Sequence, residues 1–563
     1  MFLGREAARP IPREHDMNTR SRFALTALAA IALAAASCGK QPDPAQQAWW
    51  SHVAYLASDS LEGRNTGTLG YRKAATYVAE QFEKYGARPG AGDSYFQSID
   101  FISRRIREDE SSLELLRNGV TQPIVMGEEA TISMSLDPAP EVEAPLVFAG
   151  YAMHVPGADY DDLQGLDLQG RIVVYISGGP KSIDAPLRAH AQSSEERWKA
   201  LRERGAVGLL SLHNPHKADV PWERAVKRRF EPRLTMAEDA LNKMPGLQFA
   251  GSLNGGKVAH WFEGTGHTLE EVLDLATREE PLPRFPLPGI LRAKVAFDEA
   301  PLSSDNVVGI IPGTDPEVMD EYVVLTGHLD HLGVGGAVDG DSIYNGAMDN
   351  AAGIATMIEI AKMAQVRGAR PRRSLMLLAV TAEEKGLLGS RHFAAHPTVP
   401  AEGIVANVNM DMYLPIVPFE WLTVYGRGES DLGDWIVPHA QKQGARVQDD
   451  PEPHRRIFIR SDQYNFILMG VPALFCKIGF DPGTPAEQAF KDWTKNRYHA
   501  PSDDLEQPVD MAAAVAFTEM LYDFCMDIAD RDERPQWKED SFFRRFAVEA
   551  GRVAAAEEGA SGP

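Results

Sequence analysis

From Asn306 onward the chain alternates between apolar runs of strand length and helical segments. The apolar runs are VVGIIPG, YVVLTGH, SLMLLAVT, IVANVNMDM, WLTVYG and VPALFCKIG. Between the second and third runs, NAAGIATMIEIAKMAQ places Ile354, Met357, Ile358 and Ala361 on one helical face. Continuous apolar strands separated by helices are typical of a sheet buried on both faces. The pattern predicts an α/β fold with a mixed, mostly parallel sheet flanked by helices.

The region before Asn306 has a different pattern, and 563 residues are long for a single core. Residues 48–101 are expected to be mainly helical, because TGTLGYRKAATYVAEQFEKYGA has helical spacing. From about residue 140, short strands such as PLVFAGYAM and GRIVVYISG alternate with turns, which indicates a smaller β-rich unit. We therefore expect a main domain in two parts, a β-rich insert and a loosely held charged tail. Their predicted ranges are 48–139 and 286–535 for the main domain, 140–285 for the insert and 536–563 for the tail.

Residues 1–38 are predicted to be a secretion leader. Starting at Met17, two arginines precede an apolar run of residues 23–36, and small residues then lead to Cys38. The sequence AASC is similar to a lipoprotein processing site, with Cys38 as the lipidated residue and the only membrane anchor. We expect an exported bacterial protein, periplasmic or tethered to the outer membrane. A buried alanine-rich helix is disfavoured by the polar GKQPDPAQQ that follows.

Charge and cysteine content narrow the classes of partner. The formal net charge of -23 argues against nucleic acid or anionic lipid as the main partner. The chain has only 3 cysteines, so no disulfide framework is predicted. Cys476 and Cys525 lie in apolar segments and are expected to be buried free thiols. Nothing in the sequence predicts an oligomeric state.

Side chains that can bind metal ions follow several of the predicted strands. They are His328 and Asp330 after YVVLT, Glu383 and Glu384 after SLMLLAVTA, Asp411 after IVANVNM, Asp349 before a helix, and His499 after DWTKNRY. Each alone has an ordinary explanation, such as a helix cap, an acidic helix start or a solvated histidine. Sites in open α/β sheets form at the carboxyl ends of strands, so we expect these side chains to converge. Together they suit two neighbouring divalent ions that share one carboxylate.

The segments that carry these residues resemble family 28 of the metallopeptidases, the two-zinc exopeptidases. The matching segments are GHLDHLG, GAMDNAAG, AVTAEEKGLLGS, NVNMDM and RYHAPSDDL, in the order of that family. LASDSLEGRNTGTLGYRKAATYVAEQF resembles the N-terminal segment of the family. The stretch FAGYAMHVPGADYDDLQGLDLQGRIVVYISG is similar to a protease-associated domain, which would be the β-rich insert.

The resemblance implies a ligand set for two Zn²⁺ ions per chain. Asp349 would bridge both ions, His328 and Asp411 would complete one position, and Glu384 and His499 the other. Zinc, cobalt and manganese all suit these ligands. The resemblance also implies a cis peptide bond after Asp349.

Three further carboxylates receive roles from the same resemblance. Glu383 would be the base that takes a proton from water and returns it to the leaving amine. Asp330 would accept the second N–H of the His328 ring, and Asp503 would do the same for His499. The adjacent glutamates can differ in role, because Glu384 must stay ionised to bind metal whereas Glu383 must gain and lose a proton.

Each of three aromatic residues near the matching segments has two possible roles. Tyr464 or Tyr498 is a candidate donor to a developing oxyanion, although either could equally be a packed core tyrosine. His331 follows Asp330, and we expect it at the surface rather than at the entrance of the site. No serine lies in a nucleophile elbow, so serine chemistry is disfavoured.

The function that the resemblance implies is that of a zinc aminopeptidase acting on peptides. Three further functions stay open at this point. A glutamate-releasing carboxypeptidase would grip a free carboxylate, for which Arg427, Arg455, Arg456 and Arg460 are available. A glutaminyl cyclase needs only one zinc, and a non-catalytic binding module would be expected to lose ligands. The side-chain preference does not follow from the sequence.

Overall fold

The computed structural model describes residues 43–134, 139–218 and 220–553. The predicted leader and Cys38 lie outside these ranges. The chain divides into a unit of residues 1–47, whose described part begins helix α2 (Pro44–Leu56), and a unit of residues 48–563. Among the described residues, none of the helices combines the length and apolarity that crossing a membrane requires.

The larger sheet of the second unit has parallel strands at its centre. Its order is β11 (Arg233–Met236), β2 (Phe96–Ile106), β14 (Phe297–Ile311), β18 (Ser374–Val380), β15 (Tyr322–His328), β19 (Ile404–Asn409), β22 (Ala473–Ile478), β20 (Trp421–Tyr425) and β21 (Arg446–Gln448). The short β1 (Arg88–Pro89) pairs with β14. The strands β18, β15, β19 and β22 run parallel, whereas β14 is antiparallel to both β2 and β18, and β20 is antiparallel to β22. The predicted mixed α/β fold is confirmed.

Both faces of this sheet are covered, which explains why its strands are apolar throughout. Along β15, Val323 and Leu325 pack into the core cluster under helices α3 (Leu69–Lys84), α8 (Ala352–Arg367) and α14 (Met511–Asp530). Val324, between them, joins the opposite cluster with Phe393 of α9 (Leu388–Ala395) and Phe466 of α12 (Gln463–Leu468). Each buried aliphatic side chain contributes roughly 1.5–3 kcal/mol to stability, so the centre of the sheet is a rigid base for the loops at its edge.

The second sheet belongs to the β-rich insert. Its order is β4 (Val120–Pro123), β3 (Ser112–Arg117), β13 (Phe285–Lys294), β6 (Glu141–Phe148), β9 (Ile172–Ile176), β10 (Gly208–His213), β12 (Phe249–Asn254) and β5 (Ala130–Ile132). It packs with helices α4 (Ala185–Ala191), α5 (Ser194–Arg202) and α7 (Leu269–Thr277). Two short hairpins, β7 (His154–Val155) with β8 (Tyr160–Asp161) and β16 (Gly333–Val338) with β17 (Asp341–Tyr344), complete the strands. The other α-helices of the described residues are α6 (Trp222–Ala225), α10 (Leu432–Trp435), α11 (Val437–Lys442), α13 (Pro485–Asn496) and α15 (Arg544–Glu549).

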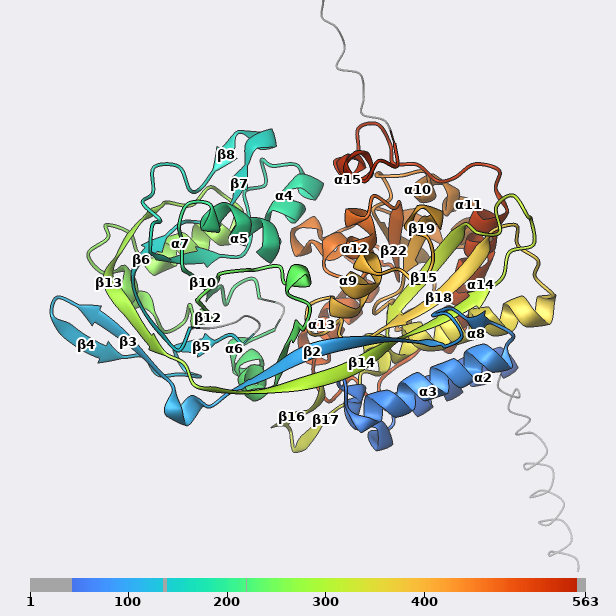
Figure 1. Ribbon diagram of the computed structural model, residues 1–563, viewed down its shortest axis with the longest axis horizontal. Coiled ribbons are helices and arrows are strands. Elements are labelled where there is room, and N and C mark those ends of the chain that lie inside the picture. Colours follow the sequence, from blue (N-terminus) through green and yellow to red (C-terminus); the bar gives the residue numbers. More distant parts are fainter. Residues whose placement is uncertain (1–42, 135–138, 219, 554–563) are drawn as a thin grey trace, which may run out of the picture. The chain divides into compact units, whose positions relative to one another are not determined.

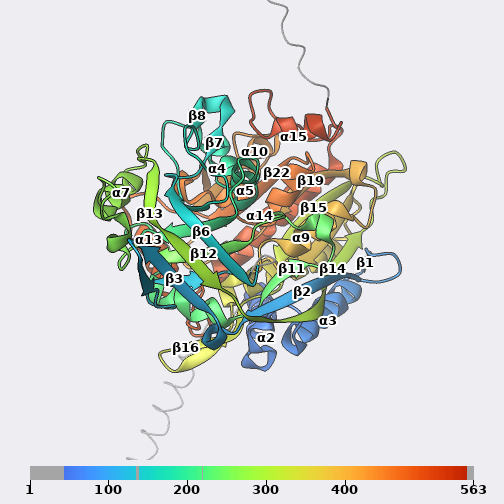
Figure 2. The same cartoon turned by 60° about the vertical axis from the view of Figure 1, so that its left-hand side comes forward.

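The insert is wider than the predicted range of residues 140–285. Its sheet extends from Ser112 to Lys294, and β11 within that range returns to the larger sheet. The long antiparallel pair β2–β14 leads from one sheet to the other, as Figures 1 and 2 show. Because β2 begins at Phe96, the predicted helical region also ends early, with α3 at Lys84. The likeness of the insert to a protease-associated domain stays a prediction.

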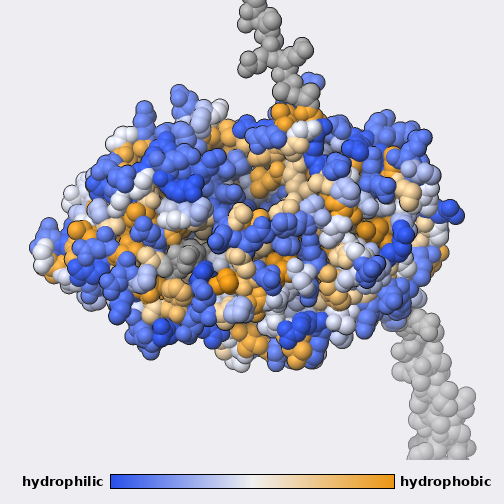
Figure 3. All heavy atoms as spheres, in the orientation of Figure 1, coloured by the Kyte–Doolittle hydropathy of each residue, from blue (hydrophilic) through white to orange (hydrophobic). Residues whose placement is uncertain are grey.

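The tail of the chain is packed, so the prediction of a loosely held tail is wrong for residues 536–553. Trp537 and Phe543 are buried in a cluster with Ile467 of α12, and Trp537 Nε1 donates to the Gly470 carbonyl at 3.0 Å. The high charge of this segment suggested a solvated tail, but its aromatic side chains favour burial. The predicted free, buried thiols of Cys476 and Cys525 are confirmed. The face in Figure 3 is mainly hydrophilic, in keeping with the high charge.

Candidate metal centre

The candidate site lies at the carboxyl ends of the parallel strands. His328 is the last residue of β15 and pairs in register with Val380 at the end of β18. Glu383 and Glu384 therefore follow at the same edge, and Asp411 follows the end of β19 beside them. This is the edge at which an open α/β sheet forms its sites.

One group of ligand atoms surrounds His328. Its Nε2 lies 3.2 Å from Asp349 Oδ1 and 3.4 Å from Asp411 Oδ1, and all three residues are buried. The other ring nitrogen, Nδ1, lies 3.0 Å from the backbone carbonyl of Asp330. That carbonyl accepts an N–H from Nδ1, so a metal ion at the two carboxylates would be bound through Nε2.

A second group lies on the other side of Asp349. His499 Nε2 is 3.4 Å from Asp349 Oδ2 and 3.2 Å from Glu384 Oε2. His331 Nδ1 is 2.9 Å from Glu384 Oε1 and 3.9 Å from Asp349 Oδ2. The two carboxylate oxygens of Asp349 thus face two different groups, which is the arrangement of a bridging ligand.

The donor set fits a pair of divalent cations. Two groups, His328–Asp349–Asp411 and His331–Asp349–Glu384, each bring one atom per side chain within 4.8 Å of one another. Both ring nitrogens of His331 and Oε1 of Glu384 are buried, and within the described part of the chain none of them has a partner with hydrogen-bond geometry. Leaving buried polar atoms unsatisfied costs about 1–3 kcal/mol each, and a bound cation would satisfy them. Nitrogen and oxygen donors of this kind suit Zn²⁺ and related ions.

The electrostatics of the site separate the two adjacent glutamates. Burial raises the pKa of Glu383 well above its ordinary value, and the carboxylates of Asp411 and Asp462 raise it further. Burial also acts on Glu384, but His499 and His331 hold its pKa well below the ordinary range. A pair of carboxyl groups with pKa values driven apart is typical of an acid–base group beside a permanent anion.

The loop that carries Asp349 is held by hydrogen bonds to Met410 and to Asp503. It forms a π-helical turn over Ala347–Ala351, and the predicted cis peptide bond between Asp349 and Asn350 is confirmed. The amide of Asn350 donates to the Met410 carbonyl at 2.8 Å. The Asp503 carboxylate accepts the backbone N–H groups of Met348 at 2.9 Å and of Asp349 at 3.0 Å.

A buried arginine that the sequence did not single out holds the same loop. The Arg64 guanidinium donates to the carbonyls of Asn345 at 2.6 Å and Gly346 at 3.0 Å, and also to Leu329 at 3.0 Å. It also donates to the carbonyl of Leu56. Arg64 therefore ties the N-terminal helical segment to both ligand-bearing loops. No periodicity marks this residue in the sequence.

Two predicted supporting roles are wrong. The His328 ring bonds the backbone carbonyl of Asp330, while the Asp330 carboxylate accepts hydrogen bonds from Thr66 Oγ1 at 3.1 Å and the Glu383 backbone N–H at 3.0 Å. Asp503 supports Asp349 rather than His499, whose Nδ1 lies 3.1 Å from Nη1 of Arg228 in the insert. The reason is the same in both cases: the loop geometry turns these carboxylates toward backbone N–H groups.

The aromatic candidates differ in their distance from the metal centre. Tyr464 lies in the buried cluster around Trp537 and Phe543, and its hydroxyl is 2.8 Å from His190 Nδ1. It is therefore a packed tyrosine. Tyr498 lines the cavity at the metal centre, and its ring stacks on His499 with centroids 3.9 Å apart. His331 is fully buried, so the predicted surface position is wrong.

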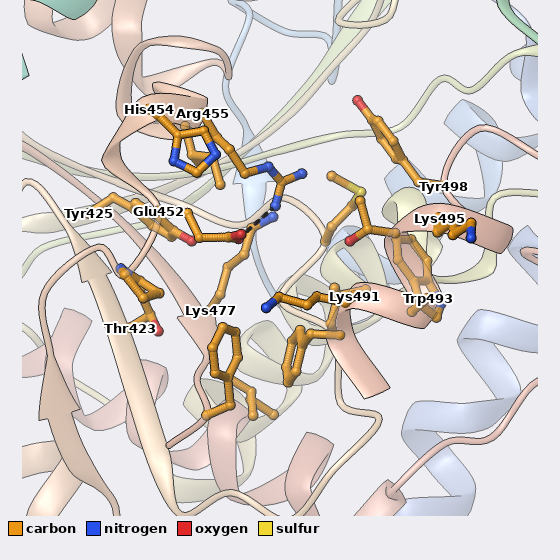
Figure 4. A pocket seen from close by; sticks show the side chains of 18 of the residues that line it. Thr423, Tyr425, Glu452, His454, Arg455, Lys477, Lys491, Trp493, Lys495 and Tyr498 are labelled. Carbon is orange, nitrogen blue, oxygen red and sulfur yellow. Dashed lines mark hydrogen bonds and ion pairs between the residues drawn. The ribbon is translucent and has the colours of Figure 1, made fainter. Parts of the chain in front are cut away.

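The cavity at the site carries positive charge beside the carboxylates. It is lined by Asp349, Glu383, Glu384, Asp411, Met412, Arg455, Ile457, Arg460, Ser461, Phe475, Lys477, Tyr498 and His499. A second cavity of about 410 Å³ adjoins it and shares Arg455, Lys477 and Tyr498. Figure 4 shows the Arg455–Glu452 ion pair, 3.1 Å long, and Lys477 facing the same cavity as Trp493 and Tyr498. Lys477 is 8% exposed, and burial lowers its pKa to about 8.

The fold and the site together define a class of α/β protein. Helices cover both faces of its central sheet, and paired histidine–carboxylate groups lie at the carboxyl ends of the parallel strands. Residues 306–525 match the model of Peptidase family M28, so the chain contains a domain of this family. The matched range includes all the proposed ligands.

Individual relatives agree with this family over short stretches. A probable glutamate carboxypeptidase, LAMP1, of Arabidopsis thaliana is 32% identical over 133 residues, or 23% of this chain and 18% of that protein. The aminopeptidase NAALADL1 of Mus musculus is 32% identical over 139 residues, or 24% of this chain and 17% of that protein. The matches thus span less than a fifth of these two relatives.

A solved structure is similar over nearly the whole chain. An aminopeptidase from Aneurinibacillus sp. strain AM-1 superimposes with a TM-score of 0.53, covering 87% of this chain and 95% of that one. At 17% identity, this likeness shows the fold.

Proposed function

We propose that this protein is a metal-dependent exopeptidase, and first of all an aminopeptidase that releases N-terminal residues from peptides. The observation that carries the proposal is the Asp349 carboxylate, whose two oxygens face two separate ligand groups beside Glu383. The family M28 domain over residues 306–525 supports it. His328 and Asp411 would hold one Zn²⁺ and Glu384 and His499 the other, with Asp349 shared.

Zinc ions held there would polarise a peptide carbonyl and bring the pKa of a water molecule toward ~7. Glu383 would accept a proton on its carboxylate as that water attacks, and would then pass the proton to the nitrogen of the leaving amine. The Glu383 backbone N–H donates to the Asp330 carboxylate, which holds the main chain that carries this side chain. The Tyr498 hydroxyl, in the same cavity, would donate to the carbonyl oxygen.

A carboxypeptidase is the second candidate, and the cations in the cavity favour it. Of the four arginines that the sequence offers for this role, Arg455 and Arg460 line the metal-centre cavity, as does Lys477. Arg427 instead pairs with Asp449 at 3.2 Å, and Arg456 donates to the Gln192 carbonyl at 3.3 Å. A cationic lining attracts a free carboxylate and repels a terminal ammonium group.

A glutaminyl cyclase and a non-catalytic binding module receive less support. The cyclase needs one metal position, whereas two complete ligand groups share Asp349 here. A binding module without activity would not need Glu383, whose raised pKa suits proton transfer. Export and lipidation at Cys38 remain part of the proposal, as do peptide substrates and two zinc ions per chain.

Blocked peptides test the proposal and separate its two forms. The zinc-loaded full chain would be incubated with one peptide sequence in three versions: free at both ends, N-acetylated, and C-amidated. An aminopeptidase cleaves the free and C-amidated versions, whereas a carboxypeptidase cleaves the free and N-acetylated ones. Cleavage must stop with a chelator and in Glu383→Gln. If no version is cleaved across a library of terminal residues, the exopeptidase proposal is wrong.

A further inference from the structure

His331 lies in the metal centre, although it is not one of the five expected ligands. Its side chain is fully buried, although it lies in a glycine-rich loop, where a histidine is usually solvated. Nδ1 lies 2.9 Å from Glu384 Oε1 and 3.9 Å from Asp349 Oδ2, and the ring centroid is 6.1 Å from that of His499. The imidazole therefore stands inside the second ligand group, not behind it.

Hydrogen bonding does not account for this position. By hydrogen-bond geometry, neither ring nitrogen of His331 has a partner among the described residues, and neither does the facing Oε1 of Glu384. Nδ1 and Oε1 lie 2.9 Å apart, within ion-pair distance, and both belong to a group of atoms close enough together to hold one metal ion. A cation bound by both Nδ1 and Oε1 would give each of them a partner, which makes Nδ1 the candidate ligand atom.

Packing fixes the ring in that place. A Cβ added at Gly346, whose φ is +61°, would lie 2.5 Å from Cγ of His331. The backbone N–H of His331 also donates to the Arg64 carbonyl at 3.2 Å. Gly346 thus leaves room for the ring directly beside the turn that carries Asp349, as a built ligand requires.

We propose that His331 is a sixth metal ligand, which binds through Nδ1 at the position shared by Asp349, Glu384 and His499. This inference rests on the proposed metal centre but not on its reaction. It gives the second position four protein donors, whereas the first position, at His328, has three. A position closed by four protein ligands suits tight, retained zinc, and one with three keeps a place for water or substrate. The second position would therefore fill first and exchange last.

Zinc titration of the full chain against a competing chelator tests the inference. Wild type should bind two ions with clearly different affinities. His331→Phe keeps a flat ring but no donor, and should weaken the tighter ion by more than ~100-fold, beyond the ~10–100-fold loss typical of an outer-shell partner. His396→Phe is the matched control, because it removes a histidine from the separate group of Glu238, His392 and His396. This control should leave both affinities unchanged.

A second variant distinguishes a ligand from a structural ring. His331→Cys in the cobalt-loaded protein should show a thiolate-to-cobalt charge-transfer band, which appears only if the sulfur is bonded to the metal. Circular dichroism would establish that each variant is folded, and the cobalt band is read only in folded protein. The inference is overturned if His331→Phe binds both zinc ions as wild type does, or if His331→Cys lacks the band. By contrast, wild type that binds no zinc, or Asp349→Asn that binds two ions unchanged, would overturn the metal centre itself.

Discussion

The Asp503 carboxylate accepts the backbone N–H of Asp349 at 3.0 Å, across 154 residues of sequence. The same carboxylate accepts the N–H of Met348 and the side-chain amide of Gln507, the latter at 2.6 Å. Asp503 is itself fully buried. It therefore sets the position of the bridging carboxylate through the main chain, without contacting the proposed metals.

Asp503→Ala should lower zinc affinity by ~10–100-fold, because the loss of an outer-shell partner leaves Asp349 free to shift. A chelator competition would measure this. Asp504→Ala is the matched control, since its carboxylate accepts only the exposed Glu506 N–H at 2.8 Å among the described hydrogen bonds. Equal zinc affinity in both variants would contradict the role assigned to Asp503.

Glu383→Gln should retain zinc and lose ~10²–10⁴-fold in peptidase rate, because the amide cannot accept the proton from water. Glu384→Gln should instead lose zinc, because it removes a charged ligand. Metal content by mass spectrometry and single-turnover rates would separate the two effects. Near-full activity in a zinc-loaded Glu383→Gln protein would refute the proton-transfer role.

Asp330→Asn should lower kcat more than zinc affinity, because the carboxylate holds the Glu383 backbone and Thr66 rather than the His328 ring. The rate per bound metal would be compared with that of Thr66→Val, which removes only one of these contacts. Loss of zinc with an unchanged rate per metal would restore the role that the sequence suggested.

Lys477→Met should reduce kcat/KM about 10–100-fold for peptides with a carboxylate next to the scissile bond, because a hydrogen bond to a charged group contributes about 1.5–3 kcal/mol. Matched peptides with glutamate or glutamine at each terminal position would show which carboxylate matters. The control is Lys442→Met, whose ammonium pairs with Asp523 at 2.5 Å. Equal losses on glutamate and glutamine peptides would remove the charge explanation.

The stability of the protein should fall on acidification below pH 6.5 through His190. Burial among the tail aromatics, and nearby Arg545, lower the pKa of His190 from 6.5 to about 4. The unfolded imidazole protonates first, so the stabilisation is complete above pH 6.5 and is lost as the pH falls to about 4. At most this amounts to roughly 3 kcal/mol.

Denaturant unfolding of wild type and His190→Gln from pH 7 to pH 4 would measure this loss. The difference between the two free energies of unfolding should change by most of that amount. His216→Gln is a control because this histidine is exposed. Parallel curves for wild type and His190→Gln would show that the imidazole does not titrate as stated.

The sequence predicted the residues at the centre of the site better than those that support them. His328, Glu384 and Asp411 follow apolar strands, and parallel strands end at one edge, so their convergence follows from periodicity. Supporting contacts depend on which way a loop turns, and they often go to backbone atoms that have no sequence signal. This is why the predicted partners of Asp330 and Asp503 are wrong.

Residues from distant segments were missed for a related reason. Arg228 reaches His499 from the insert, and Lys477 is one residue of an otherwise apolar strand. His331 was misplaced because a histidine in a glycine-rich loop is usually solvated. The extent of the insert was underestimated because β3 and β13 pair although most of the insert separates them in sequence, and local patterns do not reveal such pairing.

The contacts of Arg64 and Asp503 determine when, during synthesis of the chain, the metal centre can be completed. This guanidinium joins Leu56 to Gly346, while Asp503 reaches back to Asp349 from near the end of the chain. A nascent polypeptide can form these Arg64 contacts only after Gly346 has emerged, and it lacks Asp503 until most of the described residues have emerged. The proposed hydrolytic centre is consequently among the last parts of the molecule to be completed, and we expect a ribosome-bound fragment that ends before Asp503 to be inert toward the proteins around it.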